Sequence, residues 1–327
     1  MLNRSRGSRD SSYACLYFAS APSKSPWLKS IVADAQAYRL VHGEADALPG
    51  LVVDVYHEYV VVQTLTQGTE KLKEELVRAL TDLLHPRGIL ERNDPRVRLF
   101  EGLDQRAGVL SGEVPDRVDV VQGGNLFEVD LLHGQKTGLF LDQRENHAAA
   151  ASYARGRVLD AFCYAGGFAL AAARGAREVV AVDSSQEALA QLGRNGARNG
   201  FGNIQAVEAN VFDHLRELEM RRERFELVIL DPPAFAKNKG TIPSAKRGYK
   251  EINLRARRLL APGGILVTCS CSHHVNENDF LAILEDAASD AGIPVSLIER
   301  RSQARDHPVA LGVPETSYLK AFILRRT

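Results

Sequence analysis

Two carboxylates and a pair of glycines mark the first place where this sequence could do chemistry. Asp160 ends an apolar run, and the turn of small residues that follows it contains Gly166 and Gly167. Asp183 ends a second apolar run about 20 residues further on. A strand, a tight turn, a helix start and a second carboxylate are typical of a nucleotide-binding α/β unit, in which the second acid accepts hydrogen bonds from a ribose diol.

The turn also favours one cofactor over another. It lacks a full G-x-G-x-x-G pattern, and a pyrophosphate needs those glycines for close approach to the backbone. S-adenosylmethionine (SAM) carries no phosphate, so the turn favours SAM over a nicotinamide dinucleotide. Asn210 follows a third apolar run and offers the donor and acceptor of an adenine contact, although an ordinary strand-end turn uses the same residue type. The cofactor-binding residues predicted here are Asp160, Phe162, Gly166, Asp183, Ser184, Asn210 and Val211.

A rigid acidic loop, Asp231-Pro232-Pro233-Ala234-Phe235, follows another apolar run. The two prolines remove two backbone donors and fix φ, so the loop is stiff and its carbonyls stay free. A carboxylate can accept a hydrogen bond from an exocyclic amine such as cytosine N4, and Phe235 could stack on a base. We interpret this segment as a base-binding loop rather than as a solvated strand exit.

Cys271 discriminates between two kinds of methyl transfer. C5 of cytosine becomes nucleophilic only after a thiolate adds to C6, and a base must later remove the C5 proton. Such a cysteine needs a positive neighbourhood that lowers its pKa from about 8.5. Free cysteines are commonly small buried hydrophobes, and we assign that role to Cys269. Cys271 with Asp231 is therefore the predicted catalytic pair.

Basic residues follow the base-binding loop. A charge run is more often a solvated face, but here it adjoins the loop directly and carries aromatic side chains on which unstacked bases could lie. The predicted substrate-binding residues are Phe235, Lys237, Arg247, Tyr249 and Lys250. A second cluster of functional side chains lies upstream of the cofactor turn, between Gly134 and Asn146. We interpret it as a wall of the cofactor pocket, with Lys136, Thr137 and Phe140 as contacts.

Apolar strands that alternate with helices must position these residues. From Val158 onward the pattern predicts a Rossmann-like, doubly wound parallel sheet, with a late antiparallel strand at its edge. Upstream, residues 34–40 are expected to form a short helix. Two strands around a His57–Glu58 turn form a hairpin, a helix spans residues 69–84, and residues 105–124 form a hinge. The predicted organisation is a polar leader (1–28), a small α/β module (29–120) and a methyltransferase domain (121–327).

Composition adds bounds on partners and location. Lys plus Arg and Asp plus Glu both number 41, so any nucleic-acid binding must come from a local patch. Neither a membrane span nor a signal peptide is apparent. The four cysteines lack both zinc-ligand spacing and a disulfide framework, which favours a reducing cytoplasm and no metal. The oligomeric state stays open, and a homodimer is compatible with the sequence.

Several short motifs follow one another along the chain: Tyr38–Leu40, Gly43–Leu51, Gly134–Gly138, Leu141–Arg144, Asp231–Phe235, Arg247–Lys250, Ser270–Ser272, Asp306–Val309 and Tyr318–Lys320. In this order they resemble the bacterial large-subunit ribosomal RNA cytosine-C5 methyltransferases of the 5-methylcytosine-1962 type. The resemblance runs from about Tyr38 to the end of the chain. It implies a class I methyltransferase domain behind a small α/β module, SAM as methyl donor, ribosomal RNA as partner and Cys271 as nucleophile. Members usually begin with a PUA RNA-binding domain, which the residues before Trp27 are too few and too polar to form.

Two alternatives remain open from the residues alone. An exocyclic-amine nucleic-acid methyltransferase would need the Asp231 loop but not Cys271. A non-catalytic RNA-binding relative would keep the fold without binding SAM.

Overall fold

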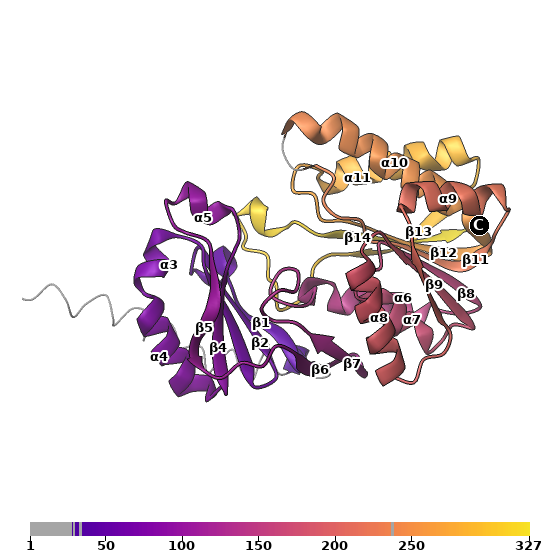
Figure 1. The fold of residues 1–327 in the computed structure, drawn as a ribbon. Coiled ribbons are helices and arrows are strands. Elements are labelled where there is room, and N and C mark those ends of the chain that lie inside the picture. Colours follow the sequence, from indigo (N-terminus) through magenta and orange to yellow (C-terminus); the bar gives the residue numbers. More distant parts are fainter. Residues whose placement is uncertain (1–27, 29, 33–34, 237–238) are drawn as a thin grey trace, which may run out of the picture. The chain divides into compact units, whose positions relative to one another are not determined.

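The computed structural model describes residues 28, 30–32, 35–236 and 239–327, which form two compact units (Figure 1). The first unit contains the described residues up to Leu141 and the later segment Arg305–Thr316, and the second contains Asp142–Ala304 and Ser317–Thr327. The boundary therefore lies after Leu141 and not at residue 120. The reason is a hairpin of β6 and β7 that belongs to the first unit, where Ala35 bridges to Gln122. The predicted leader, apart from Leu28, lies outside the described residues.

The first unit is built on a five-stranded sheet of order β1-β2-β3-β4-β5. Only β3 and β4 pair in parallel, and the two helices α3 and α4 connect them. The predicted hairpin around His57–Glu58 is confirmed as β2 and β3. The elements are β1 (Ala37–His42), β2 (Leu51–Tyr56), β3 (Tyr59–Thr64), α3 (Gln67–Lys71), α4 (Lys73–Leu84), β4 (Gly88–Asn93), α5 (Val97–Phe100), β5 (Arg106–Gly112), β6 (Val118–Gln122) and β7 (Asn125–Val129).

Two expectations for this unit are wrong. The helix expected over residues 34–40 is instead the strand β1, because its residues pair with β2 and bury Leu40 and Val41 in the core. The hinge expected over residues 105–124 contains β5 and β6. Strand β5 is mostly exposed and rich in small and polar residues, so its local sequence gives little strand signal. Strand β6 contains three valines and forms a hairpin with the next strand, β7, across Gly123 and Gly124, which is a local signal that the hinge interpretation overlooked.

The second unit contains a seven-stranded sheet of order β10-β9-β8-β11-β12-β14-β13. The five strands from β10 to β12 in this order run parallel, which confirms the predicted doubly wound sheet. The last strand, β14, is antiparallel as expected, but it lies between β12 and β13 rather than at the edge. The strands are β8 (Arg157–Ala161), β9 (Glu178–Asp183), β10 (Ile204–Glu208), β11 (Phe225–Leu230), β12 (Leu260–Ser270), β13 (Val295–Arg301) and β14 (Lys320–Arg326).

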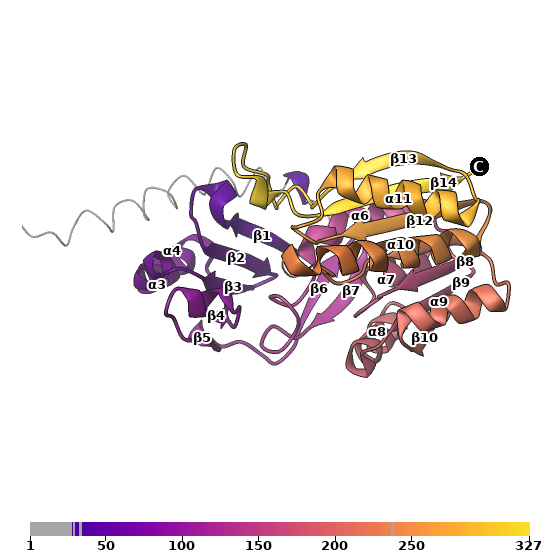
Figure 2. The same cartoon turned by 90° about the horizontal axis from the view of Figure 1, so that it is seen from above.

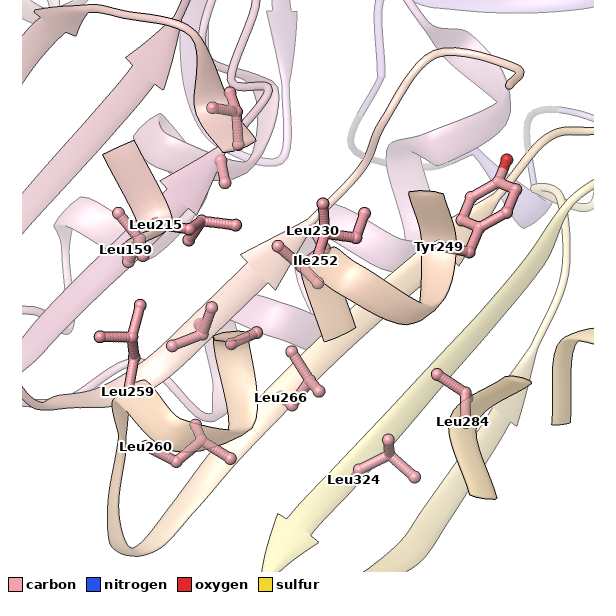
Figure 3. Packing of buried hydrophobic residues seen from close by; sticks show 14 of the residues in the cluster. Leu159, Leu215, Leu230, Tyr249, Ile252, Leu259, Leu260, Leu266, Leu284 and Leu324 are labelled. Atoms are coloured by element: carbon pink, nitrogen blue, oxygen red, sulfur yellow. The ribbon is translucent and has the colours of Figure 1, made fainter. Parts of the chain in front are cut away.

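Helices cover both faces of this sheet (Figures 1 and 2). On the face of α9, α10 and α11, leucines of the strands pack against Ile252, Tyr249 and Leu284 (Figure 3). Helix α10 begins at Ile242, and Pro243 is compatible with its first turn, where a backbone N–H is not needed. The helices are α6 (Arg144–Ser152), α7 (Gly167–Ala173), α8 (Gln186–Arg198), α9 (Val211–Met220), α10 (Ile242–Leu259) and α11 (Glu277–Ala291). Within the described ranges, none of the helices is long and apolar enough to cross a membrane.

Candidate active site

The parallel strands of the second unit bring the predicted residues to one edge of the sheet. Strands β8, β9, β11 and β12 are neighbours in register, so Asp160, Asp183, Asp231 and Cys271 follow or end adjacent strands. The carboxyl ends of parallel strands are where such sheets bind their ligands. Sequence spacing alone predicted this convergence, and the pairing register of the strands produces it.

The turn after β8 has an unusual backbone. Phe162 and Tyr164 have positive φ (67° and 47°), as does Gly166 (91°), which caps α7. The N–H groups of Phe162 and Cys163 both donate to Val182 O, at 2.9 and 3.0 Å. Non-glycine residues with positive φ are uncommon and gather at functional sites. The turn is therefore a constrained feature of the fold.

The two glycines are required by close packing on both sides. A Cβ on Gly166 would overlap the side chain of Leu192. A Cβ on Gly167 would lie 2.5 Å from Cε1 of His147, whose buried ring packs edge-on against Phe168. Burial lowers the pKa of His147 to about 4, so this ring is neutral. The absence of side chains at both positions therefore lets the turn pack closely against Leu192 and His147.

Asp160 carries a buried carboxyl group whose hydrogen-bonding capacity is unsatisfied among the described residues. It is fully buried, and neither oxygen has a hydrogen bond of normal geometry within the part of the chain that the structure describes. Burial first, and then the negative charges of Asp231 and Asp183, raise the pKa of Asp160 to about 8; the Ala169 backbone N–H offsets only part of this rise. An isolated acid is costly in such a place unless a cation or donor completes it. The site therefore fits a cationic cofactor such as SAM.

Asp183 is half-buried and already anchors the turn. One carboxylate oxygen accepts from the Tyr164 N–H at 2.9 Å, and the other accepts from the Ser185 N–H at 2.9 Å. Each oxygen keeps a further lone pair, so contact with a ribose diol is compatible with this geometry. Asn210 is exposed and caps α9, because its Oδ1 accepts from the Phe212 N–H at 3.0 Å.

The neighbouring predicted cofactor residues differ in exposure. Ser184 is exposed, whereas Val211 is buried at the start of α9. Their contacts with a cofactor stay predictions, as do those of the other residues proposed at this edge.

Gln143 orients the acid of the base-binding loop. Its Nε2 donates to Asp231 Oδ1 at 2.8 Å, while its Oε1 accepts from Asn146 Nδ2 at 2.7 Å. Gln143 and Asn146 are both buried, so their rotamers are held by packing. The segment upstream of the turn was predicted to carry functional side chains, and Gln143 is the one that the fold brings to Asp231.

An aromatic cluster supports the loop from below. Phe235 is half-buried, with its ring 6.3 Å from Phe162, 5.8 Å from Phe212 and 4.7 Å from Tyr249. Tyr249 was predicted to stack on RNA, and this is wrong because its side chain is fully buried. Its hydroxyl lies 2.9 Å from Ser272 Oγ, which also accepts from the backbone N–H of Ala236 at 3.2 Å. Tyr249 therefore holds the base-binding loop against the cysteine segment.

Cys271 lies just after β12 and faces the base-binding loop. Its half-buried Sγ is 3.9 Å from the carbonyl oxygen of Pro232, and the thiol is directed at this carbonyl. Cys269 is fully buried, in accord with its assignment as a small core residue. Lys320 of β14 reaches the same segment, since its Nζ donates to Ser272 O at 2.8 Å. No role was predicted for Lys320, although a single lysine in an apolar strand is a recognisable signal in the sequence.

The predicted basic patch is largely balanced by acids. Lys250 pairs with Asp290 of α11 at 2.9 Å, and Lys246 pairs with Asp279 at 2.6 Å. Arg247 is exposed on α10, and its contact with RNA stays a prediction. Lys237 lies outside the described residues. Fewer basic side chains therefore contribute unpaired positive charge to this surface than the run of basic residues in the sequence indicated.

Three predicted cofactor residues belong to the first unit. Thr137 is buried there, and its hydroxyl donates to Asp54 Oδ2 at 2.6 Å. Tyr56 OH lies 3.0 Å from the same hydroxyl. The prediction that the Thr137 side chain contacts the cofactor is therefore wrong, because its hydroxyl serves a buried hydrogen-bond network. The ammonium of Lys136 lies 4.3 Å from the ring centroid of Phe140, and a cofactor role for these two stays a prediction.

Comparisons with known proteins decide the family. Residues 39–325 match the family model described as S-adenosylmethionine-dependent methyltransferase. The chain therefore belongs to the SAM-dependent methyltransferases. SAM is accordingly the cofactor of this family, and its contacts with Asp160 and with the turn after β8 stay predictions. Among the described residues, no group of three or more His, Cys, Asp or Glu side chains is placed to hold a metal ion.

Curated relatives narrow the comparison. The methyltransferase is 45% identical over 294 residues to ribosomal RNA large subunit methyltransferase I of Aeromonas hydrophila, covering 88% of this chain and 74% of that one. The corresponding Photobacterium profundum protein is 47% identical over 290 residues, covering 87% and 73%. The resemblance inferred from the motifs is therefore confirmed as far as these large-subunit ribosomal RNA methyltransferases. A solved Streptococcus mutans structure described as a SAM-dependent methyltransferase shares the fold, with a TM-score of 0.83 at 22% identity over 99% of this chain and 84% of that one.

Proposed function

We propose that this methyltransferase forms 5-methylcytosine in large-subunit ribosomal RNA through a covalent adduct of Cys271. The observation that carries the proposal is the position of the Cys271 thiol against the Asp231-Pro232-Pro233 loop, 3.9 Å from the Pro232 carbonyl. A nucleophilic sulfur beside a base-binding carboxylate suits C5 chemistry. Relatives named ribosomal RNA large subunit methyltransferase I support the choice of substrate. A ribosomal substrate would place the enzyme in the cytoplasm.

Each group at the edge then has a defined task. Asp160 and Asp183 hold SAM, which when bound supplies an electrophilic methyl group. Asp231, oriented by Gln143, accepts a hydrogen bond from the exocyclic amine of cytosine. Phe235, half-buried in its aromatic cluster, offers an edge against which the base can pack.

In the proposed reaction, Cys271 forms a covalent bond to the base and later leaves it. Its thiolate forms a bond to C6, and the electron pair of the C5–C6 double bond shifts to C5, which becomes the nucleophile. After C5 has gained its methyl group, a base takes the C5 proton. The pair from that C–H bond restores the double bond, the S–C6 bond breaks, and Cys271 leaves as thiolate.

The Asp231-Pro232-Pro233 loop taken alone also favours a second reaction, methylation of an exocyclic amine. An acid followed by two prolines and an aromatic residue is sufficient to position an exocyclic amine for methylation, in which case Cys271 would be a bystander. The two reactions give different products, 5-methylcytidine and an N-methylated nucleoside.

Nucleoside mass spectrometry separates them. Ribosomal RNA from a strain that lacks the gene is incubated with SAM and either the wild-type enzyme or Cys271→Ser. We expect 5-methylcytidine from the wild type and none from the variant, which should still bind SAM because Cys271 does not line the glycine turn. Full activity of Cys271→Ser, or an N-methylated product, would overturn the proposal.

Covalent trapping gives an independent check. RNA that contains 5-fluorocytidine lacks the proton whose removal releases the enzyme, so the adduct should persist. Peptide mapping should find the nucleotide on Cys271, with Cys163 and Cys269 as internal controls because both are buried. An adduct on either of these, or none at all, would count against the mechanism.

A further inference from the structure

Lys320 is a buried cation without an acidic partner among the described residues. The residue is 7% exposed in β14, where it pairs across the sheet with Ser270, the residue before Cys271. Its Nζ donates to Ser272 O at 2.8 Å and to Tyr318 O at 2.9 Å. Over the described ranges, no carboxylate forms an ion pair with it. Its two polar partners are both neutral carbonyls.

Burial of this ammonium is unfavourable unless its positive charge stabilises a nearby group. Moving an ammonium out of water costs several kcal/mol, and two carbonyl dipoles return only part of this. A neutral donor such as glutamine could hold the same two carbonyls without the cost of a charge. The contacts therefore explain how Lys320 is held, but not why the position carries a positive charge.

Cys271 lies between Ser270 and Ser272, the two residues of this segment that Lys320 contacts. Lys320 pairs with Ser270 on one side of the cysteine and donates to Ser272 O on the other. We propose that Lys320 is a positioning residue that supplies the positive charge stabilising the thiolate of Cys271. The proposal rests on the function proposed above, because it concerns the same nucleophile.

The electrostatics of the two groups agree with this arrangement. Burial lowers the pKa of Lys320 to about 8, and negative charge on Cys271 acts in the opposite direction, favouring the ammonium. The interaction is mutual, so the ammonium stabilises the thiolate by the same amount. Near neutral pH Lys320 is therefore mostly charged, which is the form that the nucleophile needs.

Within the described part of the chain, the other titratable groups around Cys271 do not supply this charge. Burial raises the pKa of Tyr249, on α10, and that of Cys269, on β12, so both remain neutral. Asp231, on the loop after β11, is acidic and opposes a thiolate. His273, two residues after the cysteine, is exposed and packs its ring 5.6 Å from that of Tyr318. His273 is therefore the appropriate control for a competing source of charge.

The test measures the thiolate directly and needs neither RNA nor SAM. Alkylation of Cys271 by iodoacetamide is followed by peptide mass spectrometry from pH 5.5 to 9.5, and the midpoint of the rate profile reports the thiol–thiolate equilibrium. In Lys320→Gln, which keeps donors for both carbonyls but loses the charge, the midpoint should rise by about one unit or more, a loss of about tenfold in rate at pH 7. His273→Ala should leave the midpoint unchanged.

The conservative variant separates charge from structure. Lys320→Arg retains the charge and should keep the midpoint close to the wild-type value, whereas a purely structural role would predict damage from arginine and none from glutamine. A folded Lys320→Gln enzyme with a wild-type midpoint would overturn the proposal. Activity of Cys271→Ser would instead refute the proposed reaction, and it would leave the alkylation result standing as a separate fact.

Discussion

Asp160 should release a proton when SAM binds. Its pKa is about 8 in the unliganded protein, raised chiefly by burial and next by the charge of Asp231. At pH 7 a group with this pKa is about nine-tenths protonated. A cationic cofactor beside the carboxyl favours its ionised form. Binding at pH 7 is therefore expected to expel close to one proton.

Titration calorimetry measures this release. Binding enthalpies at pH 7 are compared in phosphate, HEPES and Tris, and their slope against buffer ionisation enthalpy gives the protons released. The wild type should show about 0.9 proton per SAM, and its affinity should increase with pH up to about 8. Asp160→Asn should bind SAM more weakly with no buffer dependence from this group. A wild-type enzyme with no buffer dependence, or equal slopes for both proteins, would refute the reasoning.

The same acid should make stability depend on pH in the absence of cofactor. Because the pKa of Asp160 is raised in the folded state, the folded protein binds the extra proton between about pH 4 and pH 8. Its contribution is most favourable below pH 4 and is lost as the pH rises to 8. From pH 5 to 8 the loss is at most about 4 kcal/mol in the free energy of unfolding. Urea denaturation of Asp160→Asn should lack this decline, and parallel pH profiles for the two proteins would contradict it.

Three further variants test the packing around the site. Gly167→Ala should cost about 1–3 kcal/mol in thermal denaturation and weaken SAM binding, because its Cβ would meet His147, and unchanged stability would count against the close contact. His147→Phe should reduce the loss of stability at acidic pH. Because the pKa of His147 is lowered to about 4, the wild type loses at most about 3 kcal/mol of unfolding free energy as the pH falls from about 6.5 toward 4. A variant with the same acid decline would contradict this. Tyr249→Phe should cost about 1 kcal/mol through its lost contact with Ser272 but leave RNA affinity in filter binding unchanged, whereas a large loss of RNA affinity would restore a direct role.

Much of the fold was predictable because the second unit is strongly patterned. Buried parallel strands form continuous apolar runs in the sequence, as β11 does. The turns after β8 and β11 were recognisable from their own residues. Strands β1 and β5 were missed because their strand character depends on pairing with β2 and β4, whereas β6 was missed although it forms a local hairpin with β7.

The candidate site divides in the same way. Strand-end acids and the cysteine could be found from the sequence, since a parallel sheet gathers its carboxyl ends at one edge whatever lies between them. Side-chain roles could not be read from neighbouring letters. Thr137 and Tyr249 carry suitable chemistry but face the interior, whereas Gln143 and Lys320 act only because distant strands bring them to Asp231 and to the segment around Cys271.

The sequence by itself determined the fold class, the cofactor type and the residues at the strand ends. These are properties of local pattern: apolar periodicity, turn residues and short motifs. Tertiary structure decided which polar groups are buried and which charges lack partners. Burial and partnership depend on contacts between residues far apart in the chain, and they set the high pKa of Asp160 and the unneutralised charge of Lys320. The chemistry proposed here therefore rests on sequence for its residues and on packing for their electrostatics.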